Sequence, residues 1–222
     1  MLSFKHFLSA PKETPYAPSW DCKIGTTLCS NINTSSLSTI LLERENEIKK
    51  LPVDVYGGNK VFDGHTGLGK NSTTSKSSQY NILTWDHPEI KKLKENITKN
   101  LIKYNIECGN KTPDELYIIC WYNVLRFGQK IKPHFHSSKP TCYLSGHFNV
   151  QVENTSTVYM SPINQLIYPD VLSVPNRNGD ITIFPSYIFH YTTPHYSFKP
   201  RITIAFDVNP YKSALHSHAI RL

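Results

Sequence analysis

The sequence predicts an α+β protein in which helices brace one side of an antiparallel sandwich or barrel. Two helical stretches lie in the first half of the chain, and short runs rich in Ile, Val, Tyr, Phe and Thr follow one another in the second half. With 222 residues, the chain is long enough to form one sizeable core. We therefore expect one structural domain, with an extension and supporting helices over residues 1–112 and a β-rich core over residues 113–222 that carries the chemistry.

The first half contains two predicted helices separated by a long loop. Residues 1–36 hold three prolines, which predicts irregular structure with one strand near 23–25. Apolar residues then recur at helical spacing over 37–51, and a second helix is predicted to begin after Asp86 and to end near Tyr104. The segment 57–78 is rich in Gly, Asn, Ser and Thr, so we expect a long loop, and a lid is one interpretation of it.

The second half alternates strand-forming runs with turn residues. A looser extended segment surrounds His134 and His136. The predicted strands are 116–126, 142–153, 157–160, 180–184 and 201–207.

Charge, cysteine content and hydropathy narrow the classes of partner. The formal charge is +7, and the densest group of basic residues lies on the second predicted helix. No aromatic residues alternate with these basic residues, which favours a solvated helix face over a nucleic-acid site. Nucleic acid is not excluded as a partner. Five cysteines without a CxxC pair predict neither a zinc clip nor a redox motif and fit reduced thiols in the cytoplasm. No apolar run approaches the roughly 18 residues of a membrane span, so we expect no membrane association.

Three histidines are the candidate metal ligands. His134 and His136 are two residues apart, and on an extended segment such side chains project to the same face. His190 follows the predicted strand 180–184 and a turn, which would deliver it to the same barrel mouth. Three ligands on one side of a metal are the arrangement of non-haem iron sites. Each histidine alone fits a structural role, but their order and spacing within a strand-rich segment favour the metal.

Arg201 and Thr203 form the candidate anion site. Alternation in the strand 201–207 places Arg201, Thr203 and Ala205 on one face and large apolar residues on the other. A guanidinium with a hydroxyl beside it suits a buried carboxylate, which the guanidinium can bind through two hydrogen bonds.

Further candidates for cosubstrate binding rest on the same alternation. Tyr143, Ser145, His147 and Asn149 share one face of their predicted strand, and Asn123 shares a face with Trp121 in another. Of these, Asn123, Tyr143 and Ser145 are assigned to the cosubstrate, although polar residues on the outer face of a sheet would give the same pattern. We interpret His216 and His218 as part of an exposed tail and His195 as a residue at the rim.

The segment 114–208 resembles the 2-oxoglutarate- and Fe(II)-dependent oxygenases related to the prolyl hydroxylases, of the type found in marine bacteria and phages. The motifs that carry this resemblance are Trp-Tyr-Asn at 121–123, Pro-His-Phe-His at 133–136, Leu-Ser-Gly at 144–146, Gly-Asp-Ile-Thr-Ile-Phe-Pro-Ser at 179–186 and Arg-Ile-Thr-Ile-Ala-Phe at 201–206.

The resemblance implies a double-stranded β-helix, or jelly-roll, fold. It places His134, His136 and His190 at Fe(II), and Arg201 and Thr203 at the distal carboxylate of 2-oxoglutarate. It also implies molecular oxygen as the second small-molecule cosubstrate and a cytoplasmic location in a bacterial or phage-infected cell.

The expected activity is that of a dioxygenase that hydroxylates a peptidyl, amino-acid-like or other small-molecule carbon. His136 departs from the wider superfamily, which has Asp or Glu at this position. Two alternatives therefore stay open, a cupin-like three-histidine dioxygenase that does not use 2-oxoglutarate and an inert jelly-roll binding or structural protein.

Overall fold

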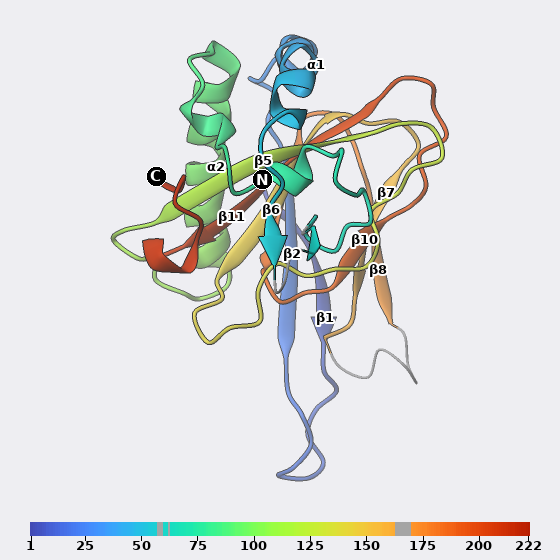
Figure 1. Cartoon of the computed structure of the whole chain (residues 1–222). Coiled ribbons are helices and arrows are strands. Elements are labelled where there is room, and N and C mark those ends of the chain that lie inside the picture. Colours follow the sequence, from blue (N-terminus) through green and yellow to red (C-terminus); the bar gives the residue numbers. More distant parts are fainter. Residues whose placement is uncertain (57–59, 62, 163–169) are drawn as a thin grey trace.

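The computed structural model describes residues 1–56, 60–61, 63–162 and 170–222. Two antiparallel sheets form the body of the protein (Figure 1). The seven-stranded sheet has the order β1-β2-β9-β6-β11-β5-β12, and the three-stranded sheet has the order β10-β7-β8. The strands of the larger sheet are β1 Ser3–Leu8, β2 Asp21–Leu28, β5 Tyr117–Leu125, β6 Leu144–Gln151, β9 Asp180–Pro185, β11 Arg201–Asn209 and β12 Ile220–Arg221. The smaller sheet consists of β7 Ser156–Met160, β8 Val171–Pro175 and β10 His190–Thr192, and β3 Val55–Tyr56 pairs separately with β4 Lys60–Val61.

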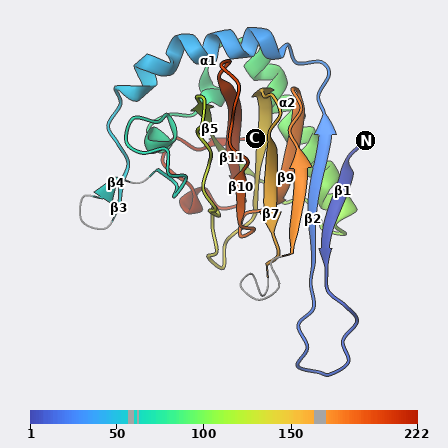
Figure 2. The same ribbon diagram turned by 90° about the vertical axis from the view of Figure 1, so that its right-hand side faces the viewer.

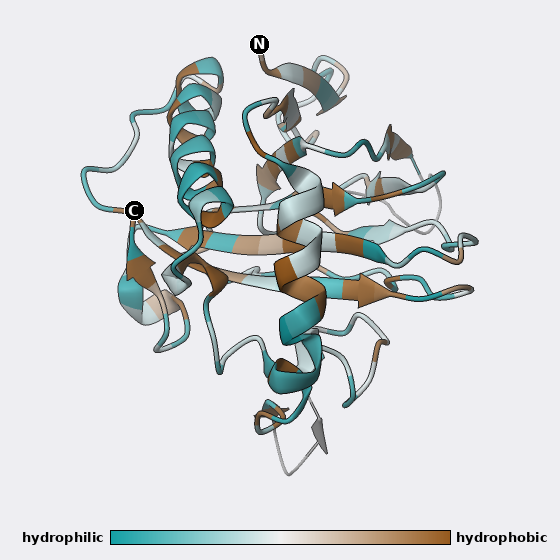
Figure 3. Ribbon diagram, turned by 90° about the horizontal axis from the view of Figure 1, so that it is seen from above, coloured by the Kyte–Doolittle hydropathy of each residue, from teal (hydrophilic) through white to brown (hydrophobic). Residues whose placement is uncertain are grey.

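Two helices cover one face of the larger sheet. Helix α1 (Thr34–Lys49) crosses the strands and helix α2 (Pro88–Glu107) lies behind them (Figure 2). The hydrophobic core on this side joins helix residues such as Leu41 and Ile97 to strand residues such as Phe148 and Ile204. In Figure 3 both helices carry hydrophilic and hydrophobic residues, as expected for helices with one buried face. None of the helices in the described part of the chain is long and apolar enough to cross a membrane.

The smaller sheet packs on the other face of the larger one. A second core joins Phe7, Ile24 and Phe184 of the larger sheet to Tyr159 and Val174 of the smaller sheet. Beside this core, strands of both sheets contribute residues to one pocket.

Most of the predicted elements are present with shifted ends. The two predicted helices are observed, but α2 is capped by His87, whose Nδ1 accepts the Glu89 amide hydrogen at 3.2 Å, and not by Asp86. Strand β1 was not predicted, because the three prolines of the first 36 residues suggested irregular structure. They lie in the loop between β1 and β2, which extends beyond the body of the molecule (Figures 1 and 2), and the strands on both sides are regular.

Candidate metal centre

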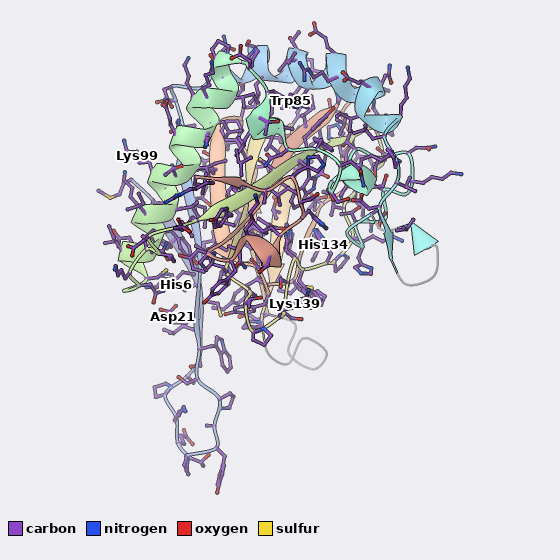
Figure 4. The ribbon with its side chains drawn as sticks, turned by 60° about the vertical axis from the view of Figure 1, so that its left-hand side comes forward. His6, Asp21, Trp85, Lys99, His134 and Lys139 are labelled. Atoms are coloured by element: carbon purple, nitrogen blue, oxygen red, sulfur yellow. The ribbon has the colours of Figure 1, made fainter. Side chains whose placement is uncertain are left out.

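The backbone brings the three predicted metal ligands together. His134 lies between β5 and β6, and it forms an isolated antiparallel bridge with His190 at the start of β10. The amide of His134 donates to the His190 carbonyl at 3.0 Å, the reverse hydrogen bond measures 2.9 Å, and the His136 amide donates to the Ser186 carbonyl at 2.9 Å. One ring nitrogen from each histidine lies within 4.8 Å of the others. Figure 4 shows His134 within the body of the molecule, whereas Lys99 on α2 lies on its outer side.

Each of the three imidazoles has a hydrogen-bond acceptor at its Nδ1 atom. The acceptors are the Lys132 carbonyl for His134 (2.9 Å), the Ile188 carbonyl for His190 (3.0 Å) and the Asp207 carboxylate for His136 (2.5 Å). A carbonyl oxygen can only accept, so the Nδ1 atoms of His134 and His190 carry the proton. Their Nε2 atoms keep a free lone pair, which is the form that binds a metal.

Burial favours the neutral, metal-binding form of these rings. Desolvation, reinforced by the neighbouring His136, lowers the pKa of His134 to about 4. Desolvation also lowers the pKa of His190, and the positive charge that His134 and His136 can carry lowers it further. These two imidazoles are therefore neutral at pH 7, and a metal ion does not have to displace a proton from them.

Arg201 is a buried cation without an acidic partner. Its side chain is only 1% exposed, and its Nε and Nη1 atoms donate to the hydroxyls of Thr155 at 3.2 Å and Thr203 at 3.4 Å. Among the described residues, no carboxylate lies within ion-pair distance of it. Desolvation lowers its pKa to about 10, which still leaves the guanidinium charged at pH 7. A buried and unpaired charge is costly, so this position suits an anionic ligand.

The histidines and Arg201 line one pocket. Sheet register explains the grouping, because Thr203 of β11 pairs with Asn123 of β5, and Ala205 pairs with His147 of β6. Another wall is formed by the loop before the first 3-10 helix (Thr74–Lys76) and by the start of that helix, where the Thr74 hydroxyl donates to Asn123 Oδ1. The lining residues are Gly64, Thr66, Thr74, Ser77, Trp121, Asn123, Ile131, His134, Phe135, His136, Gly146, His147, Thr157, Phe184, His190, Thr192, Arg201, Thr203, Ala205, Asp207 and His216.

The predicted loop 57–78 contributes to this pocket through its described part. Gly64, Thr66, Thr74 and Ser77 belong to it and line the pocket, and the Lys132 amide donates to the Thr66 carbonyl at 2.9 Å. Residues 57–59 and 62 of the predicted segment lie outside the described residues.

The three residues assigned to the cosubstrate by alternation occupy different places. Asn123 lines the pocket. Ser145 lies behind it, and its hydroxyl donates to Asp207 Oδ1 at 2.6 Å. Tyr143 is not brought to the pocket, because it precedes β6 and its hydroxyl donates to Asn105 of α2 at 3.0 Å.

Asp207 and His216 were not predicted as site residues. Asp207 continues the alternation of Arg201, Thr203 and Ala205 on β11, so its place on the pocket face was readable from the sequence. His216 is exposed, as predicted, but it also lines the pocket, because β12 pairs with β5 and draws the C-terminal segment back over the sheet. His195 is not at the rim. It is 1% exposed and its Nε2 lies 2.7 Å from the Lys199 carbonyl.

Comparison with known proteins agrees with this geometry. Residues 119–207 match the sequence model of a family described as "Putative 2OG-Fe(II) oxygenase". No curated protein matches the chain. The matched residues include the three histidines, Arg201 and Thr203. The match supports a 2-oxoglutarate- and Fe(II)-dependent oxygenase function for this segment, with Fe(II) and 2-oxoglutarate as its cofactors.

Solved structures of low sequence identity share the fold. A prolyl hydroxylase from Trichoplax adhaerens, in complex with a hypoxia inducible factor peptide fragment, is 13% identical, with a TM-score of 0.51 and 83% of each chain covered. The non-haem α-ketoglutarate-dependent carbocyclase SnoK from nogalamycin biosynthesis is 12% identical, with a TM-score of 0.53, and the alignment covers 84% of this chain and 79% of SnoK. AviO1 from Streptomyces viridochromogenes Tue57 is 13% identical, with a TM-score of 0.51 and coverages of 79% and 82%. The fold is thus a predominantly antiparallel jelly roll.

Proposed function

We propose that this chain, whose residues 119–207 are those of a 2OG-Fe(II) oxygenase, hydroxylates a carbon of a peptidyl, amino-acid-like or other small-molecule substrate. In this proposal His134, His136 and His190 hold Fe(II) through their Nε2 atoms. Arg201 and Thr203 bind the distal carboxylate of 2-oxoglutarate, and Asn123 lies beside them on the neighbouring strand. When bound, iron and cosubstrate supply the oxidative decarboxylation of 2-oxoglutarate to succinate and carbon dioxide, coupled to the hydroxylation by molecular oxygen.

The residues of the chain fit both groups. Three imidazole nitrogens within 4.8 Å of one another match a facial set of ligands, and the hydrogen bonds at Nδ1 fix the orientation of each ring. Arg201 has a buried guanidinium that donates to the uncharged hydroxyls of Thr155 and Thr203. Trp121 and Phe184 present apolar surface to the histidine cluster, with ring centroids 5.7 Å and 6.0 Å from that of His136.

Two of the similar structures act on different kinds of substrate. The solved structure from Trichoplax adhaerens holds a peptide fragment, whereas SnoK belongs to the biosynthesis of nogalamycin. We place a peptidyl or amino-acid-like substrate first because the motifs of residues 114–208 resemble those of the prolyl-hydroxylase-related group. We also propose that the helices brace the larger sheet and that the β-rich part from residue 113 onward is the catalytic core. Bacterial or phage origin and a cytoplasmic location stay predictions, as does the absence of a nucleic-acid partner.

The unpaired, buried Arg201 is the observation that carries the cosubstrate assignment. The test is an anaerobic titration of metal-free protein with Fe(II) and then 2-oxoglutarate, which should produce a visible metal-to-ligand charge-transfer band. His190→Ala should abolish Fe(II) binding and the band. His195→Ala is the matched control, because His195 is also buried but does not line the pocket, and it should keep both.

A three-histidine dioxygenase that does not use 2-oxoglutarate remains the second candidate, because no carboxylate side chain stands among the three clustered ligands. It predicts Fe(II) binding without the band and without succinate release. An inert jelly-roll protein predicts no stoichiometric metal. Succinate release that requires Fe(II) and oxygen would reject both alternatives.

A further inference from the structure

The carboxylate of Asp207 is hydrogen-bonded to one of the three candidate metal ligands, His136. Asp207 Oδ1 is hydrogen-bonded to His136 Nδ1 at 2.5 Å. A hydrogen bond from an imidazole to a carboxylate is charge-assisted. The other two ligand histidines have backbone carbonyls in the same place. His136 is thus the one clustered histidine whose Nδ1 faces a full negative charge.

Hydrogen bonds fix the position of Asp207. Ser145 donates to Oδ1 at 2.6 Å, and its oxygen lies 2.9 Å from the Ser186 hydroxyl. The amide of His136 donates to the carbonyl of the same Ser186. The ring and the backbone of His136 are therefore tied to one polar network.

The charge of a bound metal gives this network a role. Three neutral imidazoles leave the two positive charges of Fe(II) uncompensated by direct ligands, and Asp207 is the only acid among the described residues that line the pocket. A carboxylate hydrogen-bonded to a ligand histidine increases the electron donation of that ring and fixes which nitrogen binds the metal.

We propose that Asp207 is a positioning residue that holds His136 in its Nε2-binding tautomer and supplies, through that ring, the negative charge that a carboxylate ligand would otherwise bring to the metal. This inference rests on the proposed iron site at His134, His136 and His190. In this inference Ser145 holds Asp207 in place through its hydrogen bond and does not bind 2-oxoglutarate.

The test measures Fe(II) affinity of the full chain anaerobically, by competition with a chelator and without 2-oxoglutarate. Asp207→Asn keeps an oxygen that can accept from His136 but removes the charge, and Asp207→Ala removes both. We expect Asp207→Asn to weaken Fe(II) binding about 10- to 100-fold and Asp207→Ala to weaken it at least as much. Asp207→Glu, which restores the charge, should recover part of the loss.

Asp180→Asn is the matched control, because Asp180 is an acid of the same sheet that does not line the pocket. It should leave Fe(II) affinity unchanged. If Asp207→Asn binds Fe(II) as tightly as the wild type, the charge has no role and the inference is overturned. If the wild type itself binds no Fe(II), the proposed function fails first, so the two failures are distinguishable.

A measurement on the wild type covers the case in which the variants do not fold. In the Zn(II)-loaded protein, proton–nitrogen correlation spectra of the histidine rings should show His136 bound through Nε2, with the most downfield Nδ1 proton of the three ligands. A ring of His136 bound through Nδ1, or one that lacks this downfield proton, would overturn the proposal.

Discussion

Replacing Arg201 by Met should have opposite effects on cosubstrate binding and on stability. The guanidinium is 1% exposed, and its pKa falls from 12.5 to about 10 because of desolvation. At 1.36 kcal/mol per pH unit, this fall corresponds to about 3 kcal/mol by which the buried charge weakens the folded state. The charge persists at pH 7, so the folded protein without cosubstrate bears the cost of an unpaired cation. Methionine removes this cost and fills a similar volume, and the free energy of unfolding should stay constant or rise by up to about 3 kcal/mol.

The same substitution should nearly abolish binding of 2-oxoglutarate. Loss of one partner of a buried, hydrogen-bonded charge pair costs about 2–5 kcal/mol, which corresponds to an increase of about 30- to 5,000-fold in the Kd of 2-oxoglutarate. The Kd is read from the charge-transfer band of the ferrous protein, and urea unfolding of the metal-free protein gives the stability. Fe(II) affinity should remain, because Arg201 is not among the three clustered ligands.

Arg126→Met is the control for this experiment. Arg126 is half exposed and pairs with Glu45 at 2.7 Å outside the pocket, so its replacement should leave the Kd of 2-oxoglutarate unchanged. Two results would refute the reasoning. One is an Arg201→Met protein that binds 2-oxoglutarate normally, and the other is a large loss of stability, which would make Arg201 a structural residue.

Three further predictions concern stability. Acidification of the metal-free protein from pH 7 to pH 4 should lower its free energy of unfolding by up to roughly 3 kcal/mol through His134 alone. The pKa of His134 in the folded protein, about 4, lies below the unfolded value of 6.5, so the unfolded chain takes up the proton first. A free energy of unfolding, measured with urea, that stays constant over this pH range would contradict the prediction. Gly146→Ala should destabilise the fold by about 1–3 kcal/mol or more, seen as a lower urea midpoint, because a Cβ there would lie 2.3 Å from the Phe206 ring and 2.4 Å from the Thr182 carbonyl oxygen. Fe(II) at 100 times its Kd should stabilise the wild type by about 2.7 kcal/mol in anaerobic unfolding and leave the His190→Ala variant unchanged.

Local periodicity predicts which residues of β11 face the pocket. Arg201 and Thr203 face the pocket together because alternation holds throughout β11, and the same rule extends to Asp207, which was overlooked. Tyr143 shows the limit of the rule. It precedes the first residue of β6, its hydroxyl donates to Asn105 of α2, and it is not among the pocket residues.

Contacts between distant segments could not be read from the chain. The bridge between His134 and His190 depends on a three-residue strand, and the approach of His216 depends on the two residues of β12, both too short to leave a periodic signal. The partner of His136 is likewise 71 residues away in sequence. The sequence therefore shows the residue types of the candidate site, whereas the pairing of His136 with Asp207 appears only when the sheet is assembled.

The position of β11 in the larger sheet has a consequence for folding. This strand lies between β6 and β5, and both neighbours precede it by some 50 to 90 residues. Until residue 209 has been synthesised, β5 and β6 both lack the partner that joins them, and each exposes an open strand edge. Pairings over such distances form slowly, and open edges favour association between chains. We expect nascent chains shorter than about 209 residues to be trapped by chaperones or to aggregate, and folding on the ribosome to occur late and in one cooperative step.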